Sequence, residues 1–508
     1  MNNHQEIIPI GTAVPADRQA AKRHYGVHPY FTRRPFNVIR KYILHYSNPG
    51  EVVLDPFGGS GVTAIEAFLE NRIGIQNDIN PLANFIAEGI YELSKGNLAD
   101  YKYGLAVLKD RCYEILKRLP QLDDQQIKTL QKKLNLPPNI PLPTTSDVEY
   151  YHDLFSVRQL TALAVLKDAI DALDRPYARK GLLLAWSATL AKLNKTFLST
   201  EGRAESRGGS SIFSIYRYKI AKEPIELPPW ETFYERATNI IAAKKEIDAH
   251  IEYKRHAGGF SGHFKVKNKD IESLAEELKY EVDYIFTDPP YGGHISYLDL
   301  STLWNCWLDQ MPTKSARKME LIVGGELQLS EQHYTERLAT SIEACLKMLK
   351  KGRWLSVVFQ HWNVTYFSAI LSTAADHGAE LKAAISQVGD PIWSMHKKKG
   401  NQSVLAGEMI LTFQKTGKRE VLLKSRSEFD VGSMVKKILT EANSEKIYGE
   451  YLFNQLVIAA WQQSSISSLN ITKDEFSELI KNYGWHYDQS AHYWVKEKDR
   501  VLRLFAHD

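Results

Sequence analysis

The sequence predicts an α/β fold, in which a parallel sheet carries a large helical insertion and precedes a small C-terminal helical module. Three observations predict this fold. Strand-like and helix-like segments alternate with short connections before residue 96, helical periodicity alone continues up to residue 258, and the alternation then resumes. Such an interrupted alternation indicates one sheet whose two parts are separated in the sequence.

We therefore expect four parts. Residues 1–95 form the first part of the sheet domain, and residues 259–418 form the second part. Residues 96–258 form the helical insertion, which is a candidate region for target recognition. Residues 419–508 form a C-terminal module of helices followed by the aromatic ribbon "WHYDQSAHYWVKE", an order typical of a winged-helix-like module.

The elements of the sheet domain are predicted in chain order. An amphipathic helix begins after Pro35, the strand "EVVLD" follows, and glycine opens the helix "GSGVTAIEAFLENR". The strand "IGIQNDI" precedes a helix that Asn80 and Pro81 begin. In the second part, the expected strands are "GHFKVKNKD", "VDYIFTD", "RWLSVVFQHW" and "GEMILTFQK". All of these strands are expected to belong to one parallel sheet.

The composition is that of an ordinary soluble globular protein: 508 residues, 44% hydrophobic, 24% charged, with a net charge of +4. The longest apolar runs are too short to span a bilayer, and the first residues lack the pattern of a secretory signal. Three cysteines lie far apart without a CxxC pair, which argues against disulfide frameworks and zinc ribbons. We expect a cytoplasmic protein with no membrane segment and no metal site.

The stretch "VVLDPFGGSG" places a carboxylate, Asp55, at the end of a strand and glycines at the start of the next helix. Glycines there allow a ligand to approach the backbone closely. Asp78 ends the next strand about 20 residues later, where an acid can accept both hydroxyls of a ribose. Because Asp55 would repel a pyrophosphate, the pattern favours a nucleoside that carries an amino acid, such as S-adenosyl-L-methionine.

The stretch "YIFTDPPYGG" repeats this design at the end of another strand. Pro289 and Pro290 stiffen the loop and leave its carbonyl groups free to accept hydrogen bonds. Asp288 adds an acceptor and Tyr291 a flat ring. Acceptors and a stacking face suit a planar base that bears an exocyclic amine.

Together, "LDPFGGSG" and "TDPPY" resemble the cofactor and catalytic loops of the amino-methyltransferases that modify adenine N6 or cytosine N4 in DNA. "HPYFTRRPFNVIRKYI" is similar to the segment that in this family closes over the methionine end of the cofactor. The resemblance implies a Rossmann-like class I methyltransferase sheet. It implies cofactor binding by Asp55, Phe57, Gly58, Gly61, Asp78 (ribose) and Asp270 (adenine amine). It implies that Asp288, Pro289, Pro290 and Tyr291 hold the target base, and it leaves the roles of His28 and Thr32 open.

The resemblance also implies duplex DNA as a partner, with the target base flipped out of the helix. The candidate phosphate contacts lie in basic stretches and are Arg203, Arg207, Arg217, Lys397 and Lys398. Trp304 and Trp307 are expected to be core anchors, and His361 is a candidate for contact with the substrate. A restriction or phage-defence partner protein is common among relatives in this family.

Four reactions or roles remain in competition. Asp before the two prolines is commoner for adenine N6 than for cytosine N4, so we favour adenine. Enzymes that methylate guanine N2 in RNA also carry "TDPPYG", but they usually place an RNA-capture domain before the cofactor loop. A catalytically idle DNA-binding subunit would not need Asp288 and Tyr291. A fifth reaction, methylation at cytosine C5, is excluded, because it requires a cysteine nucleophile and none of the three cysteines follows a proline or ends a predicted strand.

Overall fold

The structure, a computed structural model of the chain, divides into two compact units that are described separately here. It describes residues 7–17, 23–198, 209–293, 295–387, 408–418, 429–442, 444–489 and 493–497. The Asp55 unit comprises Ala16–Leu274 and Gly293–Ser330. The Asp288 unit comprises Met1–Pro15, Ala275–Gly292 and Glu331–Asp508.

The chain contains a mixed sheet of seven mostly parallel strands with many helices, which confirms the predicted α/β fold. In the Asp55 unit the strand order is β5–β2–β1, and neighbouring strands are parallel. These strands are β1 (Val52–Asp55), β2 (Ile73–Asn77) and β5 (His263–Lys267). Helices α1 (Phe36–Tyr46), α2 (Val62–Leu69) and α3 (Pro81–Glu92) accompany them. Asp55 pairs with Gln76 in the register, so the first two strands end at the same level.

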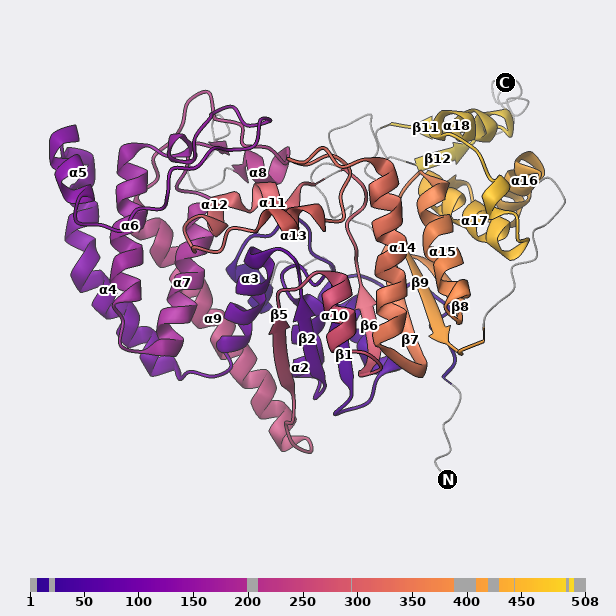
Figure 1. Cartoon of the computed structure of the whole chain (residues 1–508), viewed down its shortest axis with the longest axis horizontal. Helices are drawn as coiled ribbons and strands as arrows, with labels where there is room; N and C mark the ends of the chain where they lie inside the picture. Colours follow the sequence, from indigo (N-terminus) through magenta and orange to yellow (C-terminus); the bar gives the residue numbers. More distant parts are fainter. Residues whose placement is uncertain are drawn as a thin grey trace, which may run out of the picture. The chain divides into compact units, whose positions relative to one another are not determined.

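The insertion is mainly helical, and Figure 1 shows its long helices side by side. They are α4 (Leu98–Arg118), α5 (Asp124–Gln131), α6 (Val157–Asp171), α7 (Pro176–Leu190) and α9 (Pro229–His256). Ser156 and Gln159 form a capping box that begins α6. The fully buried Trp186 of α7 donates a hydrogen bond to the Leu163 carbonyl of α6 (2.9 Å), which fixes these two helices to each other.

Three short helices follow the second Asp-Pro loop and belong to the Asp55 unit: α11 (Tyr297–Leu300), α12 (Thr302–Asn305) and α13 (Lys314–Lys318). Trp304 and Trp307 are buried, which confirms that they are core anchors. The Trp304 indole N–H donates to the Ser187 carbonyl of α7 (2.9 Å), so α12 is attached to the insertion.

In the Asp288 unit the strand order is β6–β7–β9–β8. The strands are β6 (Val282–Thr287), β7 (Leu349–Phe359), β8 (Ala379–Gln387) and β9 (Glu408–Lys415), with helices α14 (Glu331–Met348) and α15 (Val364–Asp376). The expectation of a wholly parallel sheet is wrong, because β9 runs antiparallel to both β7 and β8. The sequence also failed to predict β8, because most of its residues are only partly buried and give no strong apolar pattern.

The C-terminal module contains three helices and a three-stranded antiparallel sheet of order β10–β12–β11. Its elements are α16 (Val431–Glu441), β10 (Lys446–Ile447), α17 (Gly449–Gln462), α18 (Lys473–Asn482), β11 (Trp485–Asp488) and β12 (Tyr493–Lys496). The ribbon expected from the sequence is β11 with β12, and β10 adds a third strand to it.

Shorter elements include η1 (Arg23–Val27), α8 (Ser211–Ser214), α10 (Ile271–Glu277) and the pair β3 (Phe197–Leu198) and β4 (Gly209–Ser210). Within the described residues, no helix is both long and apolar enough to cross a membrane. No group of three His, Cys, Asp or Glu side chains in that part of the chain is placed to hold a metal ion.

Candidate functional site

The carboxylate of Asp55 holds its own loop in shape. One carboxylate oxygen accepts the Phe57 backbone N–H (3.1 Å), and the other accepts the hydroxyl of Thr63 in α2 (2.8 Å). Asp55 and Thr63 are both buried. The acid therefore ties the end of β1 to the beginning of α2, and the loop between them has a defined conformation before any ligand arrives.

Two glycines of this loop are required by the structure. A Cβ at Gly58 would lie 2.1 Å from the Gln76 side-chain oxygen, and one at Gly61 would lie 2.5 Å from the Ala87 Cβ. Gly61 also has a φ of +87°, in the left-handed region that L side chains rarely adopt. The Gly58 N–H donates to the Asn77 carbonyl (2.9 Å), so the loop lies directly on the end of β2.

Asp78 closes the loop from the second strand. Its two oxygens accept the Gly59 N–H (2.9 Å) and the Asn80 N–H (2.8 Å). Desolvation raises the pKa of Asp78 to about 6, although both hydrogen bonds oppose that rise. An ionised carboxylate offers about four acceptor positions, so Asp78 has capacity left for two hydroxyl donors.

A residue that the sequence analysis missed, Asn77, joins this loop to the one after β5. Its side-chain NH₂ donates to the carbonyls of Pro56 (3.0 Å) and Lys269 (3.1 Å), and its side-chain oxygen accepts the Lys269 N–H (3.1 Å). Asn77 is almost fully buried. The available signal was a pair of amides, Gln76 and Asn77, at the end of a buried strand, directly before Asp78.

Asp270 lies one residue beyond Lys269 and directly before α10. Its oxygens accept the N–H (2.9 Å) and the hydroxyl (2.7 Å) of Ser273. Desolvation works to raise the pKa of Asp270, but the Ser273 hydrogen bonds outweigh it and the pKa lies below its usual value. The structure thus places Asp270 in the loop that Asn77 connects to Pro56, with its carboxylate ionised.

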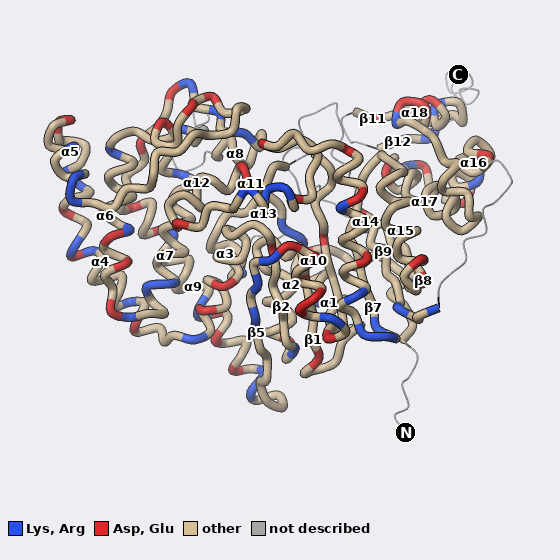
Figure 2. Tube along the Cα trace, viewed as in Figure 1, with Lys and Arg blue, Asp and Glu red and all other residues tan. Residues whose placement is uncertain are grey.

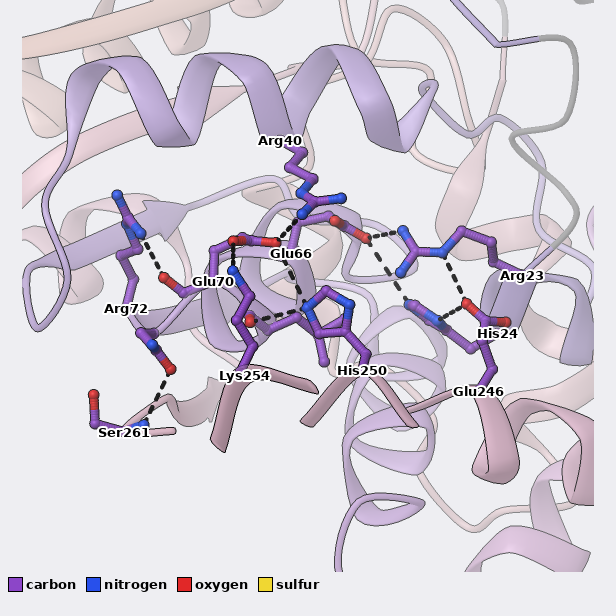
Figure 3. Close-up of polar contacts among 12 residues, drawn as sticks. Arg23, His24, Arg40, Glu66, Glu70, Arg72, Glu246, His250, Lys254 and Ser261 are labelled. Carbon is purple, nitrogen blue, oxygen red and sulfur yellow. Dashed lines mark hydrogen bonds and ion pairs between the residues drawn. The ribbon is translucent and has the colours of Figure 1, made fainter. Parts of the chain in front are cut away.

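Buried ion pairs fix α2, the helix that follows the glycine loop (Figure 3). Glu66 accepts from Arg23 (3.0 Å) and from the Tyr25 hydroxyl (2.8 Å). One turn later, Glu70 contacts Arg40 (2.6 Å) and Lys254 of α9. Both glutamates are almost fully buried. Because removing one partner of a buried pair is costly, α2 is a rigid support for the loop.

The segment "HPYFTRRP" lies against the same loop. His28 is buried, its Nδ1–H donates to the Pro29 carbonyl (2.6 Å), and its Nε2 accepts the Ser187 hydroxyl (2.9 Å), with protons assigned from these partners. Burial lowers the pKa of His28 to about 3, so the ring is neutral. Tyr30 stacks with Tyr297 at 6.4 Å, and the Thr32 hydroxyl lies 3.2 Å from the Tyr297 hydroxyl. His28 therefore has a structural role.

The second Asp-Pro loop is assembled within the Asp288 unit. The Tyr291 hydroxyl donates to an Asp288 carboxylate oxygen (2.5 Å), and the Tyr334 hydroxyl of α14 donates to the Pro290 carbonyl (2.6 Å). The Tyr291 ring meets the ring of Phe359, at the end of β7, in a T-shaped contact at 5.2 Å. Asp288, Pro290 and Tyr291 are partly exposed, whereas β6 is buried throughout. The strand is core, and its end is accessible.

His361 borders this loop. Its Nδ1 accepts the Asn363 N–H (2.9 Å), which assigns the proton to Nε2. A Cβ at Gly292 would lie 3.4 Å from that Nε2, so His361 contacts the backbone just after Tyr291. The structure thus places His361 beside the second Asp-Pro loop.

The predicted site residues fall into two assembled groups. Asp55, Phe57, Gly58, Gly61, Asp78 and Asp270 lie at the ends of three neighbouring strands in the Asp55 unit. Asp288, Pro289, Pro290 and Tyr291 lie together in the Asp288 unit. Of the candidate phosphate contacts, Arg217 forms an ion pair with Asp147 (2.7 Å). The others, Arg203, Arg207, Lys397 and Lys398, lie outside the described residues.

Comparison with known proteins agrees with the motifs. Residues 12–87, which include the first Asp-Pro loop and Asp78, match a protein-family model described as DNA methylase. Over 338 residues the chain is 29% identical to the Type II methyltransferase M.MjaII of Methanocaldococcus jannaschii. That match covers 56% of this chain and 62% of the relative, which is less than two thirds of the relative's length.

Proposed function

Because this chain is a member of the DNA amino-methyltransferase family, we propose that it transfers a methyl group from S-adenosyl-L-methionine to the exocyclic amine of a base in DNA, and that the base is adenine. The observation that carries the proposal is the second loop, in which Asp288 and the Pro290 carbonyl are held in place by tyrosine hydroxyls. Such a loop offers acceptors and an aromatic face at the accessible end of a buried strand.

The Asp55 unit supplies residues that fit the cofactor. Asp78 has acceptor capacity for a ribose diol, and the glycine loop packs so closely on Gln76 and Ala87 that its backbone is held in one place. Asp270 would accept a hydrogen bond from the adenine amine of the cofactor, and Asp55 and Phe57 would line the cofactor. When bound, S-adenosyl-L-methionine supplies an electrophilic methyl group.

Asp288 and the Pro289 carbonyl would accept hydrogen bonds from the target amine. These bonds favour a tetrahedral nitrogen, whose lone pair is no longer conjugated with the ring. That lone pair would form the new N–C bond as the S–C bond to the methyl group breaks, S-adenosylhomocysteine would be the leaving group, and the nitrogen would then lose one proton to solvent. The carboxylate then stabilises the positive charge that develops on that nitrogen. Tyr291 would stack on the flipped base, which offsets part of the cost of unstacking it from the duplex. Orientation and electrostatics, rather than a covalent intermediate, would provide the rate.

The cysteines favour amine chemistry over methylation at cytosine C5. All three are buried, and burial raises the pKa of Cys112 and of Cys306 to about 12. A thiol nucleophile reacts as the thiolate, which such pKa values disfavour. This observation supports transfer to an exocyclic amine.

We assign sequence reading to the insertion rather than to the C-terminal module. In a winged-helix-like module the helix before the ribbon, here α18, would enter the major groove. The exposed residues of α18 include Asp474, Glu475 and Glu478 against one exposed lysine, Lys481, so acidic residues predominate along it (Figure 2). Acidic side chains repel the phosphate backbone.

Transfer of a tritiated methyl group to DNA and to RNA in parallel tests the proposal. We expect labelled DNA, with the label in N6-methyladenine after hydrolysis, and no label in RNA. Label in guanine of RNA, or label in DNA that persists in Asp288→Ala, would contradict the assignment. Label in N4-methylcytosine would keep the mechanism and change the base.

A further inference from the structure

The segment Gln360–Trp362, which follows β7 in the Asp288 unit, contacts the second Asp-Pro loop through its middle residue. The His361 Nε2 lies 3.4 Å from the position that a Gly292 Cβ would take, and the His361 ring packs on the ring of Tyr366 in α15 at 4.6 Å. The Tyr366 ring packs in turn on Tyr334 of α14 (4.7 Å), whose hydroxyl donates to a carbonyl of the loop (2.6 Å). Three rings from three elements therefore border the loop.

The two outer residues of the segment contact the C-terminal module. The Trp362 ring packs on Phe453 of α17 (4.7 Å) and on Phe476 of α18 (6.0 Å). The Asn454 side-chain amide of α17 donates to the Gln360 side-chain oxygen (3.4 Å). The three partners in the module are buried. The module is therefore packed onto the end of β7 through its own core side chains.

Loop contacts and module contacts alternate along the chain at this point. Phe359, the last residue of β7, and His361 contact the loop, Phe359 through the Tyr291 ring. Gln360 and Trp362 contact the module. Successive side chains of an extended chain point to opposite sides, so four consecutive residues can serve both neighbours. Because protein interiors are close-packed, a shift of the module would move this backbone and the two side chains that touch the loop.

The same segment contains two unsatisfied polar groups. The Gln360 Nε2 and the Trp362 Nε1 are buried, and within the residues that the structure describes neither has a hydrogen-bond acceptor. A buried donor without an acceptor lowers stability, and an apolar side chain of similar size would avoid that loss. Side chains that lower stability are typical of positions that serve function.

We propose that the C-terminal module positions the second Asp-Pro loop for methyl transfer, and that Gln360–Trp362 connects the two. This inference rests on the proposed function, since it requires that the loop holds the target base. Phe359 and His361 are positioning residues that contact the loop directly, and Phe453 acts through Trp362. The module then has a role that needs no contact with DNA, which agrees with the acidic surface of α18.

Two ring truncations inside the module test the proposal. Phe453→Ala removes the ring that packs on Trp362, and the control Trp494→Ala removes a buried ring that packs on Tyr487 within the ribbon (5.4 Å). With the full chain and duplex DNA, we expect Phe453→Ala to lower kcat by about 10-fold, because a displaced loop misaligns the target amine. KM for DNA and the affinity for S-adenosylhomocysteine should stay near their native values. Trp494→Ala should retain the native kcat.

A double-mutant cycle distinguishes positioning from general destabilisation. His361→Ala should also lower kcat, and adding Phe453→Ala to it should cause little further loss, because both act through one connection. Losses that multiply would overturn the inference. Asn454→Ala leaves the aromatic contacts in place and deletes the hydrogen bonds to Gln360 and Ser386, so it should lower kcat by a smaller factor even if Phe453→Ala does not fold. A native kcat in Asn454→Ala and in any folded Phe453→Ala protein would also overturn it.

Amide hydrogen exchange separates failure of this inference from failure of the proposed function. The peptide that covers residues 287–293 should exchange faster in Phe453→Ala than in the native protein or in Trp494→Ala. Faster exchange in a protein that transfers no methyl group to DNA would support the positioning and reject the proposed function. Unchanged exchange together with native kcat in Phe453→Ala would overturn the positioning and leave the function intact. A raised KM for DNA at native kcat would overturn it in favour of DNA binding by the module.

Discussion

The two Asp-Pro loops share a sequence design, but the structure uses their acids differently. Asp55 is buried. It accepts hydrogen bonds from the Phe57 backbone N–H and from the hydroxyl of Thr63, which lies in α2. Asp288 is partly exposed and accepts from the hydroxyl of Tyr291, three residues away on an extended loop. One acid is part of the fold, and the other remains accessible at the end of its strand.

The difference follows from what comes after each loop. Behind Asp55 the chain enters α2 at Val62, and glycines and a helix keep the loop compact. Behind Asp288 two prolines prevent the backbone from forming a helix at once, and the next helix, α11, begins only at Tyr297. A rigid loop suits a ligand that is bound in one way. An accessible acid, whose tyrosine hydrogen bond can be exchanged for one from an amine, suits a base that must enter and leave.

Removing the accessible acid should have the largest effect. We expect Asp288→Ala to lower kcat by about 1000-fold or more, because the group that stabilises the developing charge is lost. Calorimetry should show unchanged affinity for S-adenosylhomocysteine. Asp288→Asn serves as the matched variant, since its amide keeps one acceptor oxygen and should retain part of the activity. Near-native kcat in Asp288→Ala would remove this loop from the chemistry.

Replacing an acid of the Asp55 unit by alanine should weaken cofactor binding rather than lower kcat. Asp78→Ala loses the acceptors for two ribose hydroxyls and the hydrogen bond to Gly59, so we expect affinity for S-adenosylhomocysteine to fall by about 100-fold. Saturating cofactor should then restore much of kcat. An unchanged dissociation constant would exclude Asp78 from the ribose site and weaken the contrast between the two loops.

The pH dependence of cofactor affinity offers a milder test of the role of Asp78. Its pKa of about 6 lies above the ordinary value for aspartate, so the carboxylate becomes protonated as the pH falls through about 6. The ionised form is the better acceptor for hydroxyl groups, so cofactor affinity should decrease below that pH and level off above it. Calorimetry from pH 5 to 8 should show this dependence in the native protein and not in Asp78→Asn. A flat profile in the native protein would contradict the assignment.

The sequence predicted those strands and loop residues that a local pattern of residues encodes. Strands β1, β2 and β6 are short apolar runs, and each ends in or next to the acid that marks its loop, so periodicity and composition sufficed. The residues that hold the loops together were not predictable in this way. Asn77 bonds to Lys269 across 192 positions, and Arg33 donates to the Tyr25 carbonyl of η1 and to the Ser60 hydroxyl of the loop. Such contacts depend on chain packing, and a single sequence contains no local signal for them.

Two substitutions of Tyr291 test whether its ring or its hydroxyl is needed for DNA binding. If the ring stacks on the flipped base, Tyr291→Ala should raise KM for DNA by about 30-fold, from the loss of roughly 2 kcal/mol of stacking. Tyr291→Phe keeps the ring and removes the hydroxyl that donates to Asp288, so its KM should stay near the native value. Steady-state kinetics with a duplex substrate separates the two. Equal increases in both variants would show that the hydroxyl, rather than stacking, holds the loop.

The smallest effect is expected for a substitution that loosens the first Asp-Pro loop. Thr63→Val replaces the buried hydroxyl that donates to Asp55 with a methyl group of similar size, so the free energy of unfolding should fall by about 1 kcal/mol. Thr63→Ser is the matched control, because it keeps the hydroxyl and loses only the methyl group. If Asp55 orders the loop for the cofactor, Thr63→Val should also weaken S-adenosylhomocysteine, and Thr63→Ser should not. Denaturant unfolding and calorimetry measure the two quantities. A valine variant that is less stable but binds the ligand normally would show that the Asp55–Thr63 hydrogen bond serves the fold alone, and that the first loop does not need its acid to be preformed.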